Sequence, residues 1–206
     1  MDPAQTLLAG ARTLGVPLSA EGAARLLALT AELARWNRTY NLTAISDPEA
    51  MLTHHLLDSL AVHPDLAGTR IADVGTGAGF PGLPLALVNP GRQFTLIDSA
   101  GKKVRFVAHA AHLLGLGNVA PLHARVEALH PGAPFDTVLA RAFAPLPELL
   151  PAIAGLCGPD TTVLALKGRR PDAEIAALPA PWRLRAERVI DVPGLDEARC
   201  VLSLSR

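Results

Sequence analysis

The stretch Asp73–Gly82, DVGTGAGFPG, is the segment that decides the fold class of this chain. Three glycines stand at every second position, directly after the apolar run RIADV. Glycine tolerates positive φ and lets backbone N–H groups approach a ligand, so the stretch predicts a binding loop between a strand and a helix. It lacks the Gly-Lys-Ser/Thr ending of a P-loop, and Phe80 replaces the third glycine of the dinucleotide fingerprint. Both departures argue against a nucleoside triphosphate and against NAD.

Short apolar segments alternate with helical ones on the C-terminal side of this loop. Strands are expected at 70–75, 93–98, 118–124, 135–141 and 161–168, and helices at 81–88, 101–115, 145–156 and 171–178. This alternation predicts right-handed crossovers and a mainly parallel sheet. The tail segments 182–190 and 199–206 have no helix between them, so they are expected to pair antiparallel at one edge. The prediction is an open seven-stranded α/β sheet that ends in a hairpin.

The first 66 residues are predicted to be helical. One helix is expected over 19–36 with Ser19 as its N-cap, and another over 47–62 with Asp47 as N-cap and Pro48 in the first turn. A polar connection, NRTYNLTAIS, lies between them. We therefore expect a helical cap segment over residues 1–66 and a Rossmann-like core over 67–206, together one domain.

Composition sets limits on the class of protein. Of 206 residues, 50% are hydrophobic and the formal net charge is zero, so the chain is globular, and its total charge argues weakly against a nucleic-acid partner. Without a basic signal-like N-terminus or an apolar run of membrane-spanning length, a cytoplasmic location is expected. Cys157 and Cys200 are expected to be buried free thiols. No heptad pattern demands a dimer, so a monomer is expected.

Two carboxylates favour S-adenosylmethionine as the ligand of the glycine loop. Asp98 ends the second expected strand, where an acid commonly binds ribose hydroxyls, and Asp73 precedes the first glycine. The simpler interpretation of each aspartate is a loop residue that caps a helix. After the third strand, Val126 and Glu127 have two interpretations. They either approach the adenine or form a helical turn in which the Glu127 carboxylate interacts favourably with the helix dipole. The cofactor contacts expected in the loop itself are Gly75, Thr76, Gly77, Gly79 and Phe80.

The end of the fourth strand bears on the methyl acceptor. Methyltransferases that modify exocyclic amino groups commonly carry Asn/Asp-Pro-Pro-aromatic there, whereas this chain has Arg141, Ala142 and Phe143. The missing acceptors favour a target atom that already has a lone pair, such as N7 of guanine. Catalysis would then depend on alignment and electrostatics, with Arg141 orienting the reactants and no general base.

Local basic clusters qualify the argument from net charge. In the expected helix 101–115, basic side chains form one stripe, with the opposite face on the sheet. A solvated face is the simpler interpretation for His109 and His112, whereas phosphate or cofactor contact is favoured for the cations at strand ends. The stripe consists of Lys102, Arg105, His109 and His112; the sheet-facing residues are expected to be Val104, Val107, Ala108 and Ala111; the strand-end cations are Lys102, Lys103, Arg141 and Lys167.

Two further groups of residues have open interpretations. Phe80 and Phe143 either stack on a base or pack in the core. His55 and Asp58 share a mostly apolar helix face, which indicates either a structural hydrogen bond or the lining of a target cleft. A metal site is not expected, since no third ligand has suitable spacing.

The chain resembles the RsmG (GidB) family, bacterial methyltransferases that make 7-methylguanosine in 16S rRNA. The resemblance is carried by WNRTYNLTAISDPEAMLTHHLLDSL, DVGTGAGFPGLPLAL, FTLIDSAGKKVRFV, ARVEAL, FDTVLARAFAPL, ALKGR and VPGLDEARCVL, in family order from about residue 36 to the C-terminus. It implies a class I S-adenosylmethionine methyltransferase acting on a specific guanine of 16S rRNA, as free RNA, 30S subunit or assembly intermediate. Ala78, where many members have proline, is a small departure.

The resemblance also assigns residues to tasks. It implies that the cofactor is bound by Gly75, Phe80, Asp98, Ser99, Val126, Glu127 and Arg141. It implies that RNA or the target guanine is met by Lys102, Lys103, Arg105, Arg125 and Lys167. It marks Asn37, Asn41, His55 and Asp58 as family positions without a task.

Three other functions are compatible with parts of the sequence. A small-molecule methyltransferase would suit the neutral net charge. A cofactor-binding ribosome-assembly protein without catalytic activity would carry the same loop. An NAD oxidoreductase is the least favoured, because of Phe80 and the context of Asp98.

Overall fold

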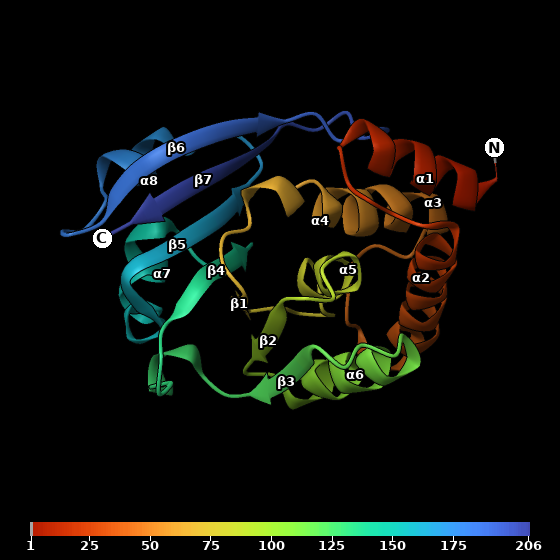
Figure 1. Ribbon diagram of the computed structural model, residues 1–206, viewed down its shortest axis with the longest axis horizontal. Coiled ribbons are helices and arrows are strands. Elements are labelled where there is room, and N and C mark those ends of the chain that lie inside the picture. The colour runs from red at the N-terminus through yellow and green to blue at the C-terminus, as the bar shows by residue number, and fades with distance from the viewer. Residues whose placement is uncertain (1) are drawn as a thin grey trace.

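A seven-stranded sheet runs through the computed structural model, which describes residues 2–206 (Figure 1). The strand order is β3-β2-β1-β4-β5-β7-β6. β1 pairs parallel with β2 and β4, while β7 runs antiparallel to both β5 and β6. The predicted parallel sheet with a terminal hairpin is confirmed. The strands are β1 (Arg70–Val74), β2 (Gln93–Asp98), β3 (Val119–His123), β4 (Phe135–Arg141), β5 (Cys157–Lys167), β6 (Arg183–Ile190) and β7 (Arg199–Ser205).

The order of the strands reverses between β1 and β4. From β1 the chain proceeds outward to β2 and β3, and then returns to the other side of β1 for β4 and β5. In open α/β sheets, ligands bind at this switch point, beyond the carboxyl ends of the strands. The glycine loop therefore stands at the place where a binding crevice is expected.

The helices cover the sheet and extend beyond it at the N-terminal end (Figure 1). The α-helices are α1 (Pro3–Thr13), α2 (Ala20–Tyr40), α3 (Pro48–Met51), α4 (Asp58–Leu60), α5 (Gly82–Val88), α6 (Gly101–Leu113), α7 (Leu146–Ala152) and α8 (Asp172–Ala176). The other helical turns are η1 (Leu52–Leu57), η2 (His63–Asp65), η3 (Val126–Ala128) and η4 (Ala154–Leu156).

The predicted N-caps of the two N-terminal helices form. Ser19 Oγ accepts the Gly22 N–H at 3.0 Å, and an Asp47 carboxylate oxygen accepts the Ala50 N–H at 2.8 Å. These bonds satisfy backbone donors that a helix start leaves unpaired. The helix expected over 47–62 contains a π-helical segment, η1, between α3 and α4. Helix α1 lies within the N-terminal region that is predicted to be helical, where no separate helix was predicted.

Asn37 and Asn41 shape the polar connection after α2. The Asn37 Oδ1 atom accepts the N–H groups of Leu42 and Thr43 at 2.6 and 2.9 Å, and its Nδ2 atom donates to the Thr43 carbonyl at 2.9 Å. Asn41 ends the helix with φ of 48°, a left-handed conformation that asparagine tolerates. Both residues therefore fix the backbone of the connection.

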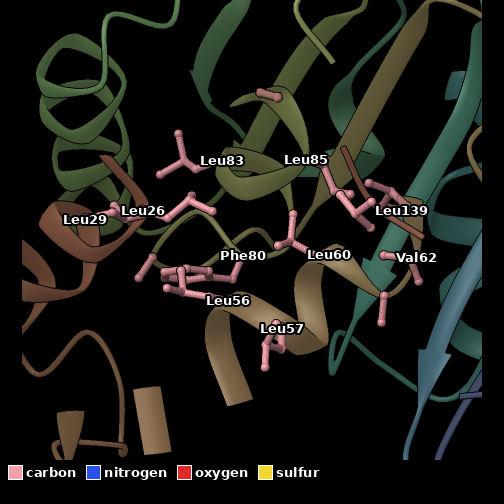
Figure 2. Packing of buried hydrophobic residues seen from close by; sticks show 14 of the residues in the cluster. Leu26, Leu29, Leu56, Leu57, Leu60, Val62, Phe80, Leu83, Leu85 and Leu139 are labelled. Carbon is pink, nitrogen blue, oxygen red and sulfur yellow. The ribbon is translucent and has the colours of Figure 1, made fainter. Parts of the chain in front are cut away.

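The cap segment, residues 2–66 of the described chain, shares one core cluster with α5 and the glycine loop. Figure 2 shows leucines of α2, η1 and α4 packed around Phe80 and the leucines that follow it in the chain. Leu26, Leu56 and Leu60 are completely buried there, and Phe80 is 3% exposed. Burial of this kind contributes about 1.5–3 kcal/mol for each large side chain. The cap is thus held to the sheet by the same cluster that holds the glycine loop.

Helix α6 differs in one respect from its predicted face pattern. Val107 and Ala111 are buried as predicted, but Val104 is only half-buried and Ala108 is exposed, because the buried face of the helix is formed by Phe106, Val107, Ala110 and Ala111. His109 does not face solvent alone: its Nε2 atom lies 2.7 Å from Glu32 Oε1, and its ring stacks on Trp36. His109 therefore joins α6 to α2.

Candidate active site

The glycine loop has the backbone conformation that its sequence predicts. Gly75, Gly77 and Gly79 have φ of 64°, 62° and 89°. This is the left-handed region, where a side chain costs energy. A Cβ atom at Gly75 would also lie 2.4 Å from the Phe143 ring, and one at Gly79 would lie 2.3 Å from Leu83. Two of the three glycines are therefore required by close packing as well as by φ.

Asp73 supports the loop from below. Its Oδ2 atom accepts the Thr76 hydroxyl at 2.6 Å and the Gly82 N–H at 2.9 Å, so it joins both ends of the loop. The side chain is buried, and its Oδ1 atom has no hydrogen-bond partner among residues 2–206. Burial raises the pKa of Asp73 to about 6, although the bonds from Thr76 and Gly82 oppose the shift.

A cavity of about 330 Å³ opens beside the loop, and we call it the glycine-loop cavity. Its walls come from the ends of β1, β2 and β4 and from the segment after β3. The lining residues are Gly75, Ile97, Asp98, Ser99, Lys103, Ala124, Arg125, Val126, Glu127, Ala142 and Phe143. Of the predicted cofactor residues, Gly75, Asp98, Ser99, Val126 and Glu127 meet here. Asp73, Thr76, Gly77, Gly79, Phe80 and Arg141 are not on its walls.

Asp98 links this cavity to the glycine loop. Its Oδ2 atom accepts the Gly77 N–H at 2.9 Å, and its Oδ1 atom accepts the Ala100 N–H at 2.8 Å. Lys103 Nζ lies 3.8 Å from Oδ2. Each carboxylate oxygen keeps a further lone pair for a hydroxyl of a bound ribose.

The donor set of the glycine-loop cavity fits S-adenosylmethionine. An acid at the end of β2 suits the ribose, and the turn with Val126 and Glu127 suits the adenine. Gly75 lines the cavity with backbone alone, and the Phe143 ring packs against it where a Cβ atom would lie. Phe143 lies over Gly75 at the cavity wall, with 36% of its surface exposed.

A second cavity of about 390 Å³ is lined by Arg141 at the end of β4, and we call it the Arg141 cavity. It is lined by Ile45, His54, His55, Asp58, Arg141, Ala142, Leu166, Lys167, Gly168, Ile190, Arg199 and Cys200. Ala142 belongs to the walls of both cavities and has φ of 50°, an uncommon conformation for a residue with a side chain. The two cavities therefore meet at the end of β4.

The two carboxylate oxygens of Asp58 pair with two different arginines in the Arg141 cavity. Its Oδ2 atom lies 3.2 Å from Arg141 Nη1, and its Oδ1 atom lies 3.1 Å from Arg199 Nε. Arg141 Nη1 also donates to the His54 carbonyl at 3.1 Å. Asp58 is 6% exposed, so the pairs are largely removed from water and are screened less than surface pairs. This network joins α4, β4 and β7.

His55 joins the cap to the glycine loop. Its ring stacks on Phe80, with centroids 4.7 Å apart and planes inclined by 19°, and its Nε2 atom lies 3.0 Å from Thr43 Oγ1. Burial lowers the pKa of His55 to about 4, with a contribution from the nearby charge of Arg141, so the ring is neutral at physiological pH. His55 and Asp58 thus make the structural contacts of one predicted interpretation, and both also line the Arg141 cavity.

The predicted RNA-binding residues separate into three places. Lys103 and Arg125 line the glycine-loop cavity, and Lys167 lines the Arg141 cavity. Lys102 and Arg105 are exposed on α6, and Lys102 Nζ donates to the Tyr40 carbonyl at 2.8 Å. Lys167 Nζ lies 2.8 Å from Glu174, whose pKa falls because this bond and the Leu146 N–H outweigh the effect of burial.

Sequence reasoning missed several walls of the Arg141 cavity. Arg199 and Ile190 come from the hairpin strands, and Ile45 comes from the connection before α3. The signal that points to Arg199 is a basic residue at the start of β7, next to the end of β5. The predicted buried thiols are confirmed, since Cys157 and Cys200 are both free and buried. Burial raises the pKa of Cys157 to about 11.

No group of three His, Cys, Asp or Glu side chains within 2–206 is arranged to hold a metal ion. In the same part of the chain, no helix combines the length and the apolar character needed to cross a membrane.

The sheet and the glycine-loop cavity define a class I S-adenosylmethionine-dependent methyltransferase. Solved structures share the fold: TrmN from Thermus thermophilus matches with a TM-score of 0.58 at 24% identity, covering 75% of this chain and 53% of that one. Magnesium protoporphyrin IX methyltransferase from Synechocystis PCC 6803, solved with bound S-adenosylmethionine, matches with a TM-score of 0.59 at 18% identity, covering 84% and 91%.

The chain belongs to the GidB family, rRNA small subunit methyltransferase G, whose model matches residues 23–202. A ribosomal RNA small subunit methyltransferase G from Azoarcus sp. is 46% identical over 198 residues, which is 96% of this chain and 93% of the relative. One from Pseudomonas paraeruginosa is 46% identical over 204 residues, covering 98% and 95%. The predictions of family, fold class, enzyme class and cofactor are confirmed.

Proposed function

We propose that this protein methylates N7 of a specific guanine in 16S rRNA, using S-adenosylmethionine bound in the glycine-loop cavity. The Arg141 cavity would receive the target base. The observation that carries the proposal is the shared wall at Ala142, because a methyl donor in one cavity and an acceptor in the other would meet there. Family membership supports the RNA as substrate.

The residues of the glycine-loop cavity support the task of holding the cofactor. Asp98 would bind the ribose, and the Gly75 backbone and Phe143 would flank the amino-acid part. When bound, S-adenosylmethionine supplies an electrophilic methyl group on a sulfonium. The hydrogen bonds from Thr76, Gly77 and Gly82 hold the loop in place before any ligand arrives, which reduces the reorganisation needed on binding.

The polar groups of the Arg141 cavity support a target atom without a proton. Both oxygens of Asp58 are engaged by arginines, and the His54 carbonyl is engaged by Arg141. His55, with its pKa near 4, is a weak base, and its Nδ1 atom is buried. A group near this pKa matches a general base at pH 7 poorly. Guanine N7 has a free lone pair and needs no base.

The remaining walls of the Arg141 cavity support the placement of the base. Arg141, held by Asp58 and by the His54 carbonyl, would orient the base, while Ile45, Leu166 and Ile190 exclude water from it.

Basic residues near the carboxyl ends of the strands support a partner with a phosphate backbone. Lys102 and Arg105 are exposed on α6, and Arg169 is exposed after β5. Such residues position a nucleic acid without reading its sequence. We expect the protein to act in the cytoplasm as a monomer, on free RNA, the 30S subunit or an assembly intermediate.

The direct experiment is methyl transfer from labelled S-adenosylmethionine to unmethylated small-subunit RNA, followed by mass spectrometry of the RNA fragments. Free RNA, 30S subunits and assembly intermediates are compared in parallel, and Arg141→Gln serves as the impaired control. We expect 7-methylguanine at one position, with at least tenfold less product from the Arg141 variant. Label on an exocyclic amino group, or no label on any of the three substrates, would contradict the proposal.

A further inference from the structure

The positive charge of the Arg141 cavity exceeds what its own acid neutralises. Three cations line the cavity, namely Arg141, Lys167 and Arg199, and Asp58 is the acid that lines it within residues 2–206. Lys167 is paired with Glu174 at 2.8 Å. Asp58 serves both arginines, so one carboxylate faces two guanidinium groups. An anionic ligand group would complete this arrangement.

One of the two carboxylates that pair with Arg199 is exposed, so a bound anion can replace it. The Nη2 atom of Arg199 lies 2.9 Å from Glu197, but the Glu197 side chain is 59% exposed. Exposed ion pairs are worth roughly 0–1 kcal/mol, so a stronger anion displaces them readily. Its Nε atom faces Asp58, whose side chain is only 8% exposed. Arg199 is therefore held by a buried carboxylate at Nε and by an exposed, exchangeable one at Nη2, while Nη1 donates to the Ala198 carbonyl at 3.0 Å.

The walls of the Arg141 cavity indicate the chemical class of the anionic ligand group. Ile45, Leu166 and Ile190 offer an apolar surface for a base, and Arg199 lies among the same lining residues. A nucleotide joins a flat base to a phosphate, so a base on the apolar walls brings its phosphate near the cations that line the same cavity. The planar fork of arginine matches two phosphate oxygens at once.

We infer that Arg199 binds a phosphate of the target RNA strand in the Arg141 cavity, with Glu197 as the partner it exchanges and Asp58 as its positioning residue. The C-terminal hairpin is then part of the RNA interface, together with the basic residues of α6. This inference rests on the proposed function, which supplies the RNA.

The test measures the dissociation constant of unmethylated small-subunit RNA against potassium chloride concentration, without turnover. Each phosphate contact contributes about one to the slope of log affinity against log salt. We expect Arg199→Gln to flatten that slope by about one and to weaken binding roughly tenfold at low salt. The affinity for S-adenosylmethionine stays unchanged, since Arg199 does not line the glycine-loop cavity.

The matched control is Arg188→Gln. Arg188 lies on the neighbouring strand and also ties the hairpin to the cap, through Asp65, but it lines neither cavity. We expect this variant to keep the wild-type slope. A wild-type slope for Arg199→Gln, or an equal change in both variants, would overturn the inference.

A second pair of variants tests the exchange with Glu197. Removing that competitor with Glu197→Gln should tighten RNA binding about threefold, which is more than Asp196→Asn does at the neighbouring exposed acid. An equal change in RNA affinity for Glu197→Gln and Asp196→Asn would overturn the proposed exchange. If Arg199→Gln does not fold, Arg199→Lys keeps the charge but loses the fork: weaker RNA binding with an unchanged slope supports the inference, and wild-type binding overturns it.

Failure of the proposed function gives a different result. Absence of methyl transfer by the wild-type protein would remove the reaction but leave the binding measurement intact. A slope that does not respond to Arg199 would remove the phosphate contact but leave the reaction intact.

Discussion

The two cavities that meet at Ala142 are built in different ways. The glycine-loop cavity takes its walls from the segments that directly follow β1, β2, β3 and β4. The Arg141 cavity takes its walls from the cap segment, the ends of β4 and β5, and the C-terminal hairpin. The sheet alone can form the first cavity, whereas the second requires parts of the chain more than a hundred residues apart. Variants that affect one cavity and spare the other test this difference.

The largest effect is expected for Asp58→Asn, which leaves two partly buried arginines facing a neutral side chain. We expect a loss of about 3 kcal/mol in the free energy of unfolding, because removal of one partner leaves charges uncompensated. The methylation rate at saturating RNA should fall about 100-fold. The dissociation constant of S-adenosylmethionine should change less than about threefold, since Asp58 lies outside the glycine-loop cavity.

The control for this variant is Asp65→Asn, which removes the partner of Arg188 outside both cavities. It should lower stability by about 1 kcal/mol and leave the methylation rate unchanged. Calorimetric titration with the cofactor and denaturant unfolding measure both variants. A large loss of cofactor affinity in Asp58→Asn would show that the two cavities are not independent.

The next effect concerns the other cavity and compares Gly75→Ala with Gly77→Ala. Both positions have positive φ, so both variants bear about 1 kcal/mol of backbone strain. A Cβ atom at residue 75 also meets Phe143 at 2.4 Å, whereas at residue 77 the nearest atom is 4.0 Å away. We expect cofactor affinity to fall about 100-fold for Gly75→Ala and less than about tenfold for Gly77→Ala. Equal losses of cofactor affinity in a binding titration would mean that the positive φ alone, and not the contact with Phe143, explains the effect.

A third effect depends on pH and tests the junction between the cap and the glycine loop. Because the pKa of His55 is lowered from 6.5 to about 4, its contribution to stability is present above pH 6.5 and is lost as the pH falls toward 4. His55→Phe keeps an aromatic ring against Phe80 without this titration. The wild type should lose on the order of 2 kcal/mol relative to the variant between pH 7 and pH 4.

Denaturant unfolding of both proteins across this pH range measures the difference. The pKa of Asp73 is raised to about 6, so ionisation of Asp73 costs stability as the pH rises through that value. Its contribution has the opposite sign and is common to both proteins, so it cancels in the difference. A difference that is constant from pH 7 to pH 4 would refute the assignment to His55.

The smallest effect is expected where the cap meets α6, away from both cavities. Glu32 accepts hydrogen bonds from Trp36 at 2.8 Å and contacts His109 at 2.7 Å. Glu32→Gln should lower the free energy of unfolding by about 1 kcal/mol, equivalent to roughly 2–4 °C in Tm. Cofactor affinity and methylation rate should stay at the wild-type level in the same preparations. A change in either would connect this contact to the cavities.

The sequence predicted the sheet and the glycine-loop cavity well because their signals are local. The glycines have positive φ, Asp98 ends β2 beside the loop, and Val126 and Glu127 follow β3. In each case a short motif determines both the backbone conformation and the side chain that the cavity receives. Positions that support the loop were harder to separate from positions that line the cavity: Asp73 and Phe80 are buried behind it.

The Arg141 cavity was predicted only in part because tertiary packing creates it. Nothing near Arg199 in the chain indicates that Asp58 will lie beside it, and Ile45 and Ile190 resemble ordinary core residues. The π-helical segment η1, which carries His54 and His55, also has no clear sequence signature. The roles of the individual site residues and the boundary at residue 66 stay predictions.

The stack of His55 on Phe80 has a consequence for the order of events during synthesis. Synthesis proceeds from the N-terminus, so the cap segment leaves the ribosome before residues 73–82. Its buried leucines share one core cluster with Phe80, so we expect this core to close only after the loop has emerged. The cap and the glycine loop are in this respect one folding unit.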